Sequence, residues 1–232
     1  IPNYIVSNKK LINNFLSSKT VEGCSVRSIQ YYKATLEKVN NQLNIPFKQI
    51  ETEDLRNYLS EYQKINNASK QTIDNIRRIL SSFFSWLEDE DYIVKSPVRR
   101  IHKIKTTKLV KETFSDEMLV NLRDNCNSIR DLAIIDMLSS TGMRVGELVK
   151  LNRNDVDFEN REIIVFGKGA KERVVYFDAK TKIHLQNYLG TRKDDNPALF
   201  VSLLKPFNRL EISGVEIALR KLGRQLGIKK VH

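Results

Sequence analysis

TGMRVGEL (residues 141–148) and FGKGAKERVV (residues 166–175) are the two stretches that decide how the second half of this sequence folds. The first ends an apolar helical run, reverses at Gly142 and begins another helix at about Arg144, since a glycine tolerates the sharp reversal that a β-carbon hinders. The second places glycines between two apolar runs, which predicts an antiparallel hairpin with Lys168 at or near its tip. Rigid elements therefore present both an arginine and a lysine.

Charge and composition favour a polyanion as the partner. The chain has 232 residues, with 39 Lys and Arg against 28 Asp and Glu, a net charge of +11. A basic domain of this size commonly binds nucleic acid, although lysine-rich faces also occur on highly soluble proteins with no such partner. No run of apolar residues is long enough for a membrane span.

Cysteine and histidine usage points away from disulfides and metals. Cys24 and Cys126 are far apart and follow no spacing pattern, which is typical of a reducing compartment. We therefore expect a cytoplasmic protein, associated with the nucleoid if it binds DNA. The three scattered His residues give no metal ligand set. His184 is expected on a helix surface, and Trp86 is expected in a helical core.

The first 94 residues predict a compact bundle of four helices. Apolar residues recur at helical spacing, and Ser25, Thr52 and Ser69 mark the starts of the second, third and fourth helices. We expect these helices at residues 8–18, 25–43, 52–64 and 69–90.

Residues 95–112 differ from the bundle before them. The run KSPVRRIHKIKTTKLVK contains seven Lys or Arg residues and no acid, with little helical periodicity. We interpret it as a cationic linker between two domains. So many like charges repel one another and favour a bound anion, although a solvated connector without a partner remains the alternative.

Residues 113–232 predict a second domain, mostly helical with a small antiparallel sheet. Ser115 is expected to cap its first helix, and Gly227 to stop its last. The predicted helices lie at residues 115–125, 130–140, from 144 onward, 181–189 and 213–226, and the strands at residues 163–166 and 174–177.

Arg144 and Lys168 are the candidate chemical groups. Glu147 lies three positions after Arg144 on the same helical face, where it braces a guanidinium able to grip a phosphate with two donors. Lys168 suits general acid work because the pKa of a lysine shifts readily on desolvation. Each residue also has an alternative interpretation without a chemical role. Arg144 could form an ordinary surface pair with Glu147, and Lys168 could belong to an ordinary polar hairpin turn.

Taken in order, TG-x-R-V-x-EL, L-x-x-x-D-V-D at residues 151–157 and GKG-x-KER-V-V resemble the catalytic domain of the tyrosine recombinase (integrase) family. The resemblance covers nearly the whole chain. It implies a SAM-like core-binding domain at residues 1–94, an interdomain connector at 95–112 and a mixed α/β catalytic domain at 113–232.

The resemblance also implies a reaction. A tyrosine attacks a DNA phosphate and forms a 3′-phosphotyrosyl link, with Arg144 gripping the scissile phosphate and Lys168 protonating the departing 5′ oxygen. It implies double-stranded DNA as partner, a homo-tetramer in the synaptic complex, and no cofactor, metal or small-molecule ligand. We expect DNA contacts from these basic residues: Arg77, Arg99, Arg100, Lys103, Lys105, Lys108, Lys171 and Arg173.

The chain departs from the family pattern at its C-terminal end. In the family a His-x-x-Arg box and the nucleophilic tyrosine lie downstream of the hairpin, whereas this chain stops at residues 227–232, GIKKVH. Whether His232 belongs to that box is left open. We expect the catalytic domain to be incomplete and this piece to be inactive alone.

Several functions remain in competition. The leading hypothesis is the integrase of a mobile genetic element, acting in site-specific recombination or transposition, and a Xer-like resolvase has the same chemistry. A non-catalytic DNA-binding module, or a truncated recombinase that only occupies sites, is the alternative from another class. A basic scaffold for RNA lacks the stacking aromatics of common RNA modules.

Overall fold

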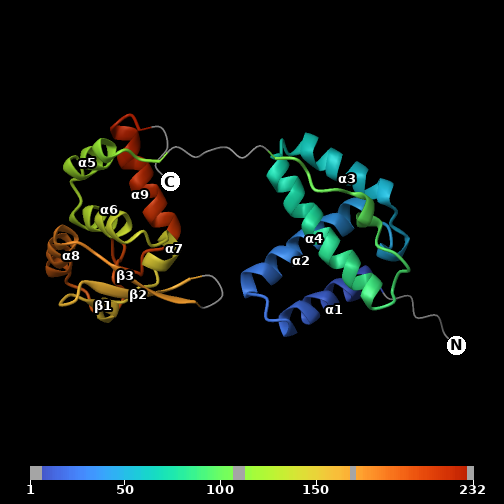
Figure 1. The fold of residues 1–232 in the computed structure, drawn as a ribbon, viewed down its shortest axis with the longest axis horizontal. Helices are drawn as coiled ribbons and strands as arrows, with labels where there is room; N and C mark the ends of the chain where they lie inside the picture. The colour runs from blue at the N-terminus through green and yellow to red at the C-terminus, as the bar shows by residue number, and fades with distance from the viewer. Residues whose placement is uncertain (1–6, 107–112, 168–170, 229–232) are drawn as a thin grey trace. The chain divides into compact units, whose positions relative to one another are not determined.

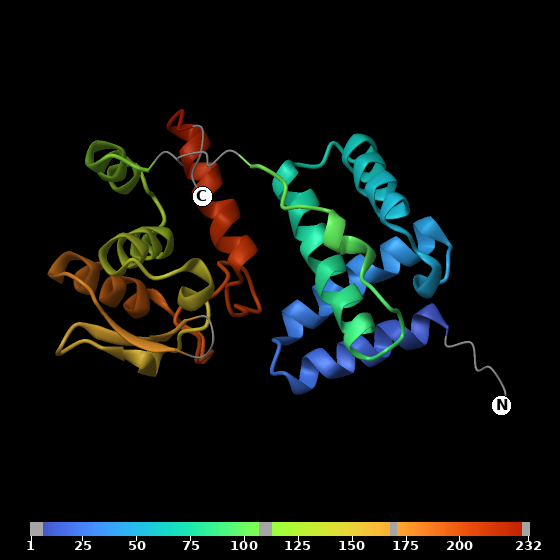
Figure 2. The same cartoon turned by 45° about the vertical axis from the view of Figure 1, so that its right-hand side comes forward.

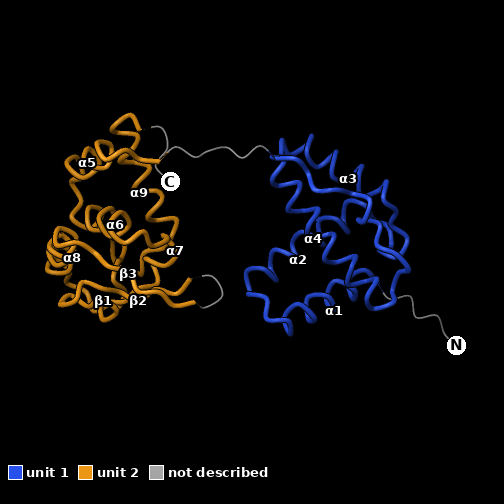
Figure 3. The backbone as a smooth tube through the Cα atoms, in the orientation of Figure 1, with its two compact units in different colours: residues 1–110 blue, residues 111–232 orange. Residues whose placement is uncertain are grey.

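The computed structural model describes residues 7–106, 113–167 and 171–228. The chain divides into two compact units, residues 1–110 and residues 111–232 (Figure 3). The described part of the first unit is helical, and that of the second combines helices with a three-stranded antiparallel sheet (Figure 1). The prediction of a mainly α chain with a small antiparallel sheet is confirmed.

Side-chain caps set the starts of the first-unit helices. The Ser25 and Ser69 hydroxyls accept the N–H groups of Ser28 and Thr72 at 3.2 and 3.1 Å, as predicted for N-caps. The third helix begins at Thr52 as expected, but its cap is Glu51. The helices are α1 (Asn8–Val21), α2 (Val26–Leu43), α3 (Thr52–Ile65) and α4 (Lys70–Asp89).

Aromatic side chains fill the core of the first unit. The Phe83 ring lies 5.3 Å from that of Phe15 and 4.9 Å from that of Phe47, both in edge-on geometry. Trp86 packs against Phe15 and is 8% exposed, as predicted for a core residue. Burying each such ring contributes about 2–3 kcal/mol, so this cluster supplies much of the driving force for folding.

The segment after α4 is folded, which corrects its assignment to a linker. A short 3-10 helix, η2 (Pro97–Arg100), packs against α3 and α4, with Val98 buried and the chain running back beside α4 (Figure 2). The buried Asp74 carboxylate accepts the backbone N–H of Ile104 at 3.1 Å and the Arg77 Nε–H at 2.8 Å. Residues 95–104 therefore belong to the first unit.

Helices of the second unit pack on one side of its sheet. α6 carries the fully buried Ala133 and Met137, and it packs closely against α8 (Figures 1 and 2). Ser115 caps the first helix, as predicted. The helices are α5 (Asp116–Asp124), α6 (Ile129–Thr141), α7 (Val145–Leu148), α8 (Ala179–Thr191) and α9 (Ile212–Gln225), with a 3-10 turn, η3 (Arg153–Asp155), before the sheet.

The sheet has the order β1–β2–β3, formed by Val156–Asp157, Glu162–Phe166 and Glu172–Tyr176. Ile163 lies opposite Val175, and both face the core with Val165. The predicted hairpin is confirmed, and β1 is an added strand that the sequence analysis did not locate. Lys168, at the predicted tip, lies outside the described residues.

Within the described ranges, no helix has both the length and the apolar character that crossing a bilayer requires.

Asp74→Asn should loosen the segment that the carboxylate holds. Burial is the largest single effect on the pKa of Asp74, and it raises that pKa. The hydrogen bonds from Arg77 and Ile104, together with the charges of Arg77 and Lys103, outweigh burial, so the pKa of Asp74 is lowered overall. We expect the free energy of unfolding at neutral pH to fall by about 2 kcal/mol. Trypsin should cut faster after Arg100 and Lys103, as peptide mapping would show.

Asp89→Asn is the matched control, because it makes the same chemical change at an exposed position on the same helix. It should alter the free energy of unfolding by no more than about 0.5 kcal/mol. If both variants resist trypsin equally at these two sites, Asp74 is not the anchor.

Candidate functional site

Arg144 is placed by the turn between α6 and α7. Gly142 ends α6 with φ of +63°, a left-handed conformation that strains any residue with a β-carbon. Arg144 then adopts an extended conformation as the N-cap of α7. Its backbone N–H donates to the Glu147 Oε2 at 2.8 Å, so the residue is fixed at its main chain.

Glu147 joins two arginines from different elements. Arg144 donates from Nη1 to Oε1 at 3.0 Å. Arg173, on β3, donates from Nη1 to Oε1 at 2.9 Å and from Nη2 to Oε2 at 2.8 Å. The second contact is a two-pronged ion pair, the strongest geometry available to an arginine and a carboxylate. The predicted bracing of Arg144 by Glu147 is therefore present.

The carboxylate of this cluster is ionised over the whole physiological range. The hydrogen bonds from Arg173 lower the pKa of Glu147 most, burial opposes them, and the hydrogen bonds from Arg144 lower it further, to about 2. Two guanidinium groups and one carboxylate leave the cluster with one net positive charge. Such a cluster favours a further anion beside it.

Exposure differs sharply among the three side chains. The Glu147 side chain is 6% exposed, whereas Arg144 is 72% exposed and Arg173 is 38% exposed. Within the described residues, Nε and Nη2 of Arg144 make no hydrogen bond. Arg144 is therefore held at one edge and offers its other edge to an incoming group.

The hairpin approaches this cluster at Gly167. A β-carbon on Gly167 would lie 3.8 Å from Glu147 Oε1 and 3.6 Å from Arg173 Nη1. The Gly167 N–H donates to the Lys171 carbonyl at 2.8 Å and closes the hairpin. Since Lys168 is outside the described residues, its convergence with Arg144 stays a prediction.

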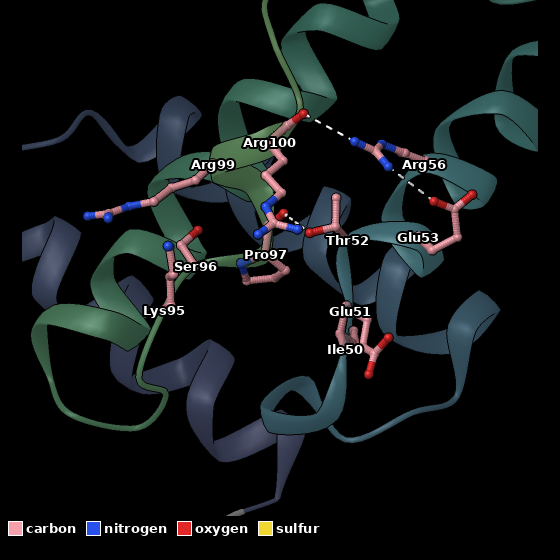
Figure 4. Close-up of a pocket in the computed structure, with 10 residues that line it drawn as sticks. All are labelled: Ile50, Glu51, Thr52, Glu53, Arg56, Lys95, Ser96, Pro97, Arg99 and Arg100. Carbon is pink, nitrogen blue, oxygen red and sulfur yellow. Dashed lines mark hydrogen bonds and ion pairs between the residues drawn. The ribbon is translucent and has the colours of Figure 1, made fainter.

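A basic hollow of about 480 Å³ lies between the start of α3 and η2 in the first unit. In Figure 4, Arg100 descends toward Thr52, while Arg99 extends to the opposite side. Arg99 pairs with Glu88 at 3.1 Å but keeps 62% of its side chain exposed. Lys95 also lines the hollow. With Arg56, the basic residues of the hollow outnumber its two acids, Glu51 and Glu53.

The other predicted DNA contacts have varied surroundings. Lys103, Lys105 and Lys171 are exposed, and Lys108 lies outside the described residues. Arg77 is only 15% exposed because it pairs with Asp74. The structure thus gives Arg77 a partner inside the protein, which the sequence analysis did not anticipate.

A second charged cluster, at the buried Asp136, escaped the sequence analysis. Its carboxylate contacts Arg123 from α5 and His184 from α8, each at 2.5 Å. His184 was expected on a helix surface, yet it is 23% exposed and bonded to a fully buried acid. The cluster joins three helices and serves the fold. Among the described residues, no three His, Cys, Asp or Glu side chains are grouped to hold a metal ion.

Comparisons with known protein families cover both units. A model of the phage integrase family matches residues 100–232, and a model of the phage integrase N-terminal SAM-like domain matches residues 11–93. The second match lies within the first compact unit, and the first match covers the whole second unit together with residues 100–110 of the first.

Related proteins of known name are similar over most of the chain. The tyrosine recombinase XerC of Thermodesulfovibrio yellowstonii is 29% identical over 227 residues, which cover 95% of this chain and 72% of that protein. XerC of Staphylococcus aureus is 32% identical over 184 residues, covering 75% of this chain. The match spans only 61% of the length of the Staphylococcus protein.

Solved structures share the fold. A lambda integrase dimer bound to a COC′ core site has a TM-score of 0.77 at 15% identity, over 96% of this chain and 64% of that one. The Tn1549 transposon integrase in complex with a circular intermediate DNA has a TM-score of 0.72 at 16% identity, over 97% of this chain and 80% of that one. At these identities the likeness concerns the fold alone.

Glu147→Gln should destabilise the second unit in a pH-dependent way. The pKa of Glu147 is lowered from 4.5 to about 2 by folding, so its contribution is complete above pH 4.5 and is lost as the pH falls toward 2. We expect a loss of about 2 kcal/mol at neutral pH. Urea unfolding of both proteins should show the difference shrinking between pH 4.5 and 2.

Glu159→Gln serves as the control, because Glu159 is exposed in the turn before β2. Its effect should be small at every pH. A stability difference for Glu147→Gln that is constant across this pH range would contradict an ionised, paired carboxylate.

Proposed function

The chain belongs to the phage integrase family, the tyrosine recombinases, and on that premise we propose that it is part of a site-specific DNA recombinase of a mobile genetic element. The recombinase cleaves and rejoins double-stranded DNA through a 3′-phosphotyrosyl intermediate. A Xer-like resolvase would use the same chemistry. The XerC relatives and the integrase-like fold support the reaction class.

The exposed but anchored guanidinium of Arg144 carries this proposal. Attack on a phosphodiester builds negative charge on the non-bridging oxygens, and donors fixed in advance stabilise that charge without reorganising. Arg144 is fixed at its backbone N–H and at Nη1, with 72% of its side chain exposed. Its free edge suits the two oxygens of one phosphate.

Lys168 is proposed as the general acid. The 5′ oxygen is a poor leaving group unless it receives a proton, and a hairpin lysine is a suitable donor. The backbone at Gly167 comes close to Glu147, which supports this placement.

The nucleophilic tyrosine is assigned to none of the described tyrosines of this chain. Tyr188 is buried and stacked on Phe200, and Tyr176 lies on β3 with no described acid–base partner. The phosphotyrosyl link keeps the energy of the broken bond, so a second DNA end can displace the tyrosine. The proposed reaction therefore requires no cofactor.

Duplex DNA is the proposed substrate, with a homo-tetramer in the synaptic complex. The lambda and Tn1549 integrases of similar fold were solved with DNA, which supports this partner. The net charge of +11 and the exposed basic side chains around η2 favour phosphate contacts in the first unit. Such contacts set affinity and position but do not read sequence.

Arg144→Ala should separate cleavage from binding. The experiment uses the full-length protein that carries this chain and a nicked suicide substrate, which traps the covalent adduct. The wild type should accumulate adduct, and Arg144→Ala should form it about a thousandfold more slowly while its DNA affinity is largely retained.

Arg144→Lys is the matched variant, since it keeps the charge but loses the two-pronged geometry, and it should recover only part of the rate. Equal loss of binding and cleavage would make Arg144 structural. A wild type that binds DNA and forms no adduct would favour a module that only occupies sites.

Replacing Arg99, Arg100, Lys103 and Lys105 by Ala should flatten the salt dependence of DNA binding. Each lost phosphate contact reduces the slope of log affinity against log salt by about 0.9. Fluorescence anisotropy over a salt series measures this slope. A charge-matched control removes four exposed lysines of α1 and α2: Lys9, Lys10, Lys33 and Lys38. If both variants lose equal slope, the cationic segment has no special role.

A further inference from the structure

Arg173 holds Glu147 more completely than Arg144 does. Its two terminal nitrogens contact both carboxylate oxygens at 2.9 and 2.8 Å. The Arg144 side chain contacts a single oxygen at 3.0 Å. The stronger, two-pronged pair is therefore made by the arginine that was expected to bind DNA.

The position of Arg173 in the sheet explains why it points to Glu147. In the register of the hairpin, Arg173 lies opposite the buried Val165, and Val175 on the same strand is also buried. Alternate residues of a strand share a face, so Arg173 is on the face that packs against the helices. An arginine in such a place needs an acid, and Glu147 of α7 supplies it.

We propose that Arg173 is a positioning residue for the recombination reaction, which orients Arg144 by occupying both oxygens of Glu147. This inference rests on the proposed function. It replaces the sequence-based assignment of Arg173 to a DNA phosphate.

The reason lies in competition for one carboxylate. A buried carboxylate left with a single cation gains most from a two-pronged pair with it. Without Arg173, Glu147 would therefore draw in the free edge of Arg144. That edge would be lost to the phosphate, and the net positive charge of the cluster would fall to zero. With Arg173 present, Arg144 stays attached at one nitrogen and open at the other edge.

Arg173 also couples two elements of the site. Arg173 lies on β3, the strand that follows the hairpin tip. Glu147, which braces Arg144, lies on α7. The pair spans 26 positions of sequence and ties these elements together. β3 and the turn carrying Arg144 thus share a common fixed point.

Cleavage and binding by Arg173 variants in the full-length protein test this role. Arg173→Ala should slow single-turnover adduct formation on the suicide substrate by about a hundredfold, the cost of a small misplacement of a catalytic group. Arg173→Lys, which keeps one charged donor, should recover part of the rate. DNA affinity should be largely retained, and adding Arg173→Ala to Arg144→Ala should lower the salt slope of DNA binding no further than Arg144→Ala alone does.

Lys193→Ala is the control, because it removes the same charge from an exposed position in the same unit and should cleave like the wild type. A salt slope lower by about one when Arg173→Ala is added to Arg144→Ala would show a separate phosphate contact by Arg173 and overturn the proposal. Unchanged cleavage by Arg173→Ala would also overturn it.

A second measurement reports on the cluster without any reaction. The ¹³C resonance of the Glu147 carboxyl should titrate with a pKa of about 2 in the wild type and Lys193→Ala. In Arg173→Ala that pKa should rise, so the acidic limb of the cleavage rate should move to higher pH. A hollow of about 610 Å³ lies beside Glu147, and the other charged groups that line it are Lys150, Asp155 and Glu172.

The two measurements separate the possible failures. A wild type that forms no adduct refutes the proposed function. An unchanged Glu147 titration in Arg173→Ala refutes the positioning role whatever the protein does to DNA. An Arg173→Ala variant that still binds DNA, cleaves slowly and shows the raised pKa of Glu147 supports both.

Discussion

A buried carboxylate shared by two arginines is the constraint on which the second unit depends. Glu147 needs both cations, because an acid taken out of water is costly unless it is paired. The same contacts fix the turn before α7, the start of β3 and the guanidinium edge that faces outward. Stability and the proposed chemistry therefore draw on one set of hydrogen bonds.

Buried acids play a similar part elsewhere in the chain. Asp74 gathers Arg77 and the backbone of Ile104 in the first unit, and Asp136 gathers Arg123 and His184 in the second. In each case an inward acid joins segments that are distant in sequence. Many of the Lys and Arg side chains remain exposed, where they are available to an anion. A strongly basic protein can thus be well paired inside and cationic outside.

Local signals explain what the sequence could predict. The caps at Ser25, Ser69 and Ser115 depend on residues three positions away, and the hairpin depends on a short glycine-containing turn. The folding of residues 95–104 onto the bundle was missed, because its anchor, Asp74, lies 30 positions before Ile104. The high positive charge and the weak helical periodicity of these residues are typical of a linker, so the sequence alone indicated one.

The partner of Arg173 was missed for a related reason. Strand alternation places Arg173 with the inward residues, and this pattern was a signal that it needed an acid nearby. No short-range rule identifies that acid, because Glu147 lies 26 positions earlier on another element. Arg144 and Glu147 were found together since they lie within one helical turn. Sequence reasoning thus placed two of the three members of the cluster together.

The aromatic core of the first unit has a practical consequence. The chain contains one tryptophan, and Trp86 lies in that core beside Phe15 and Tyr92. Its intrinsic fluorescence is therefore an optical reporter of residues 1–110 alone. Emission excited at the red edge of indole absorption follows the melting of this unit, while far-ultraviolet dichroism follows both. Comparing the two signals shows directly whether the two units melt together.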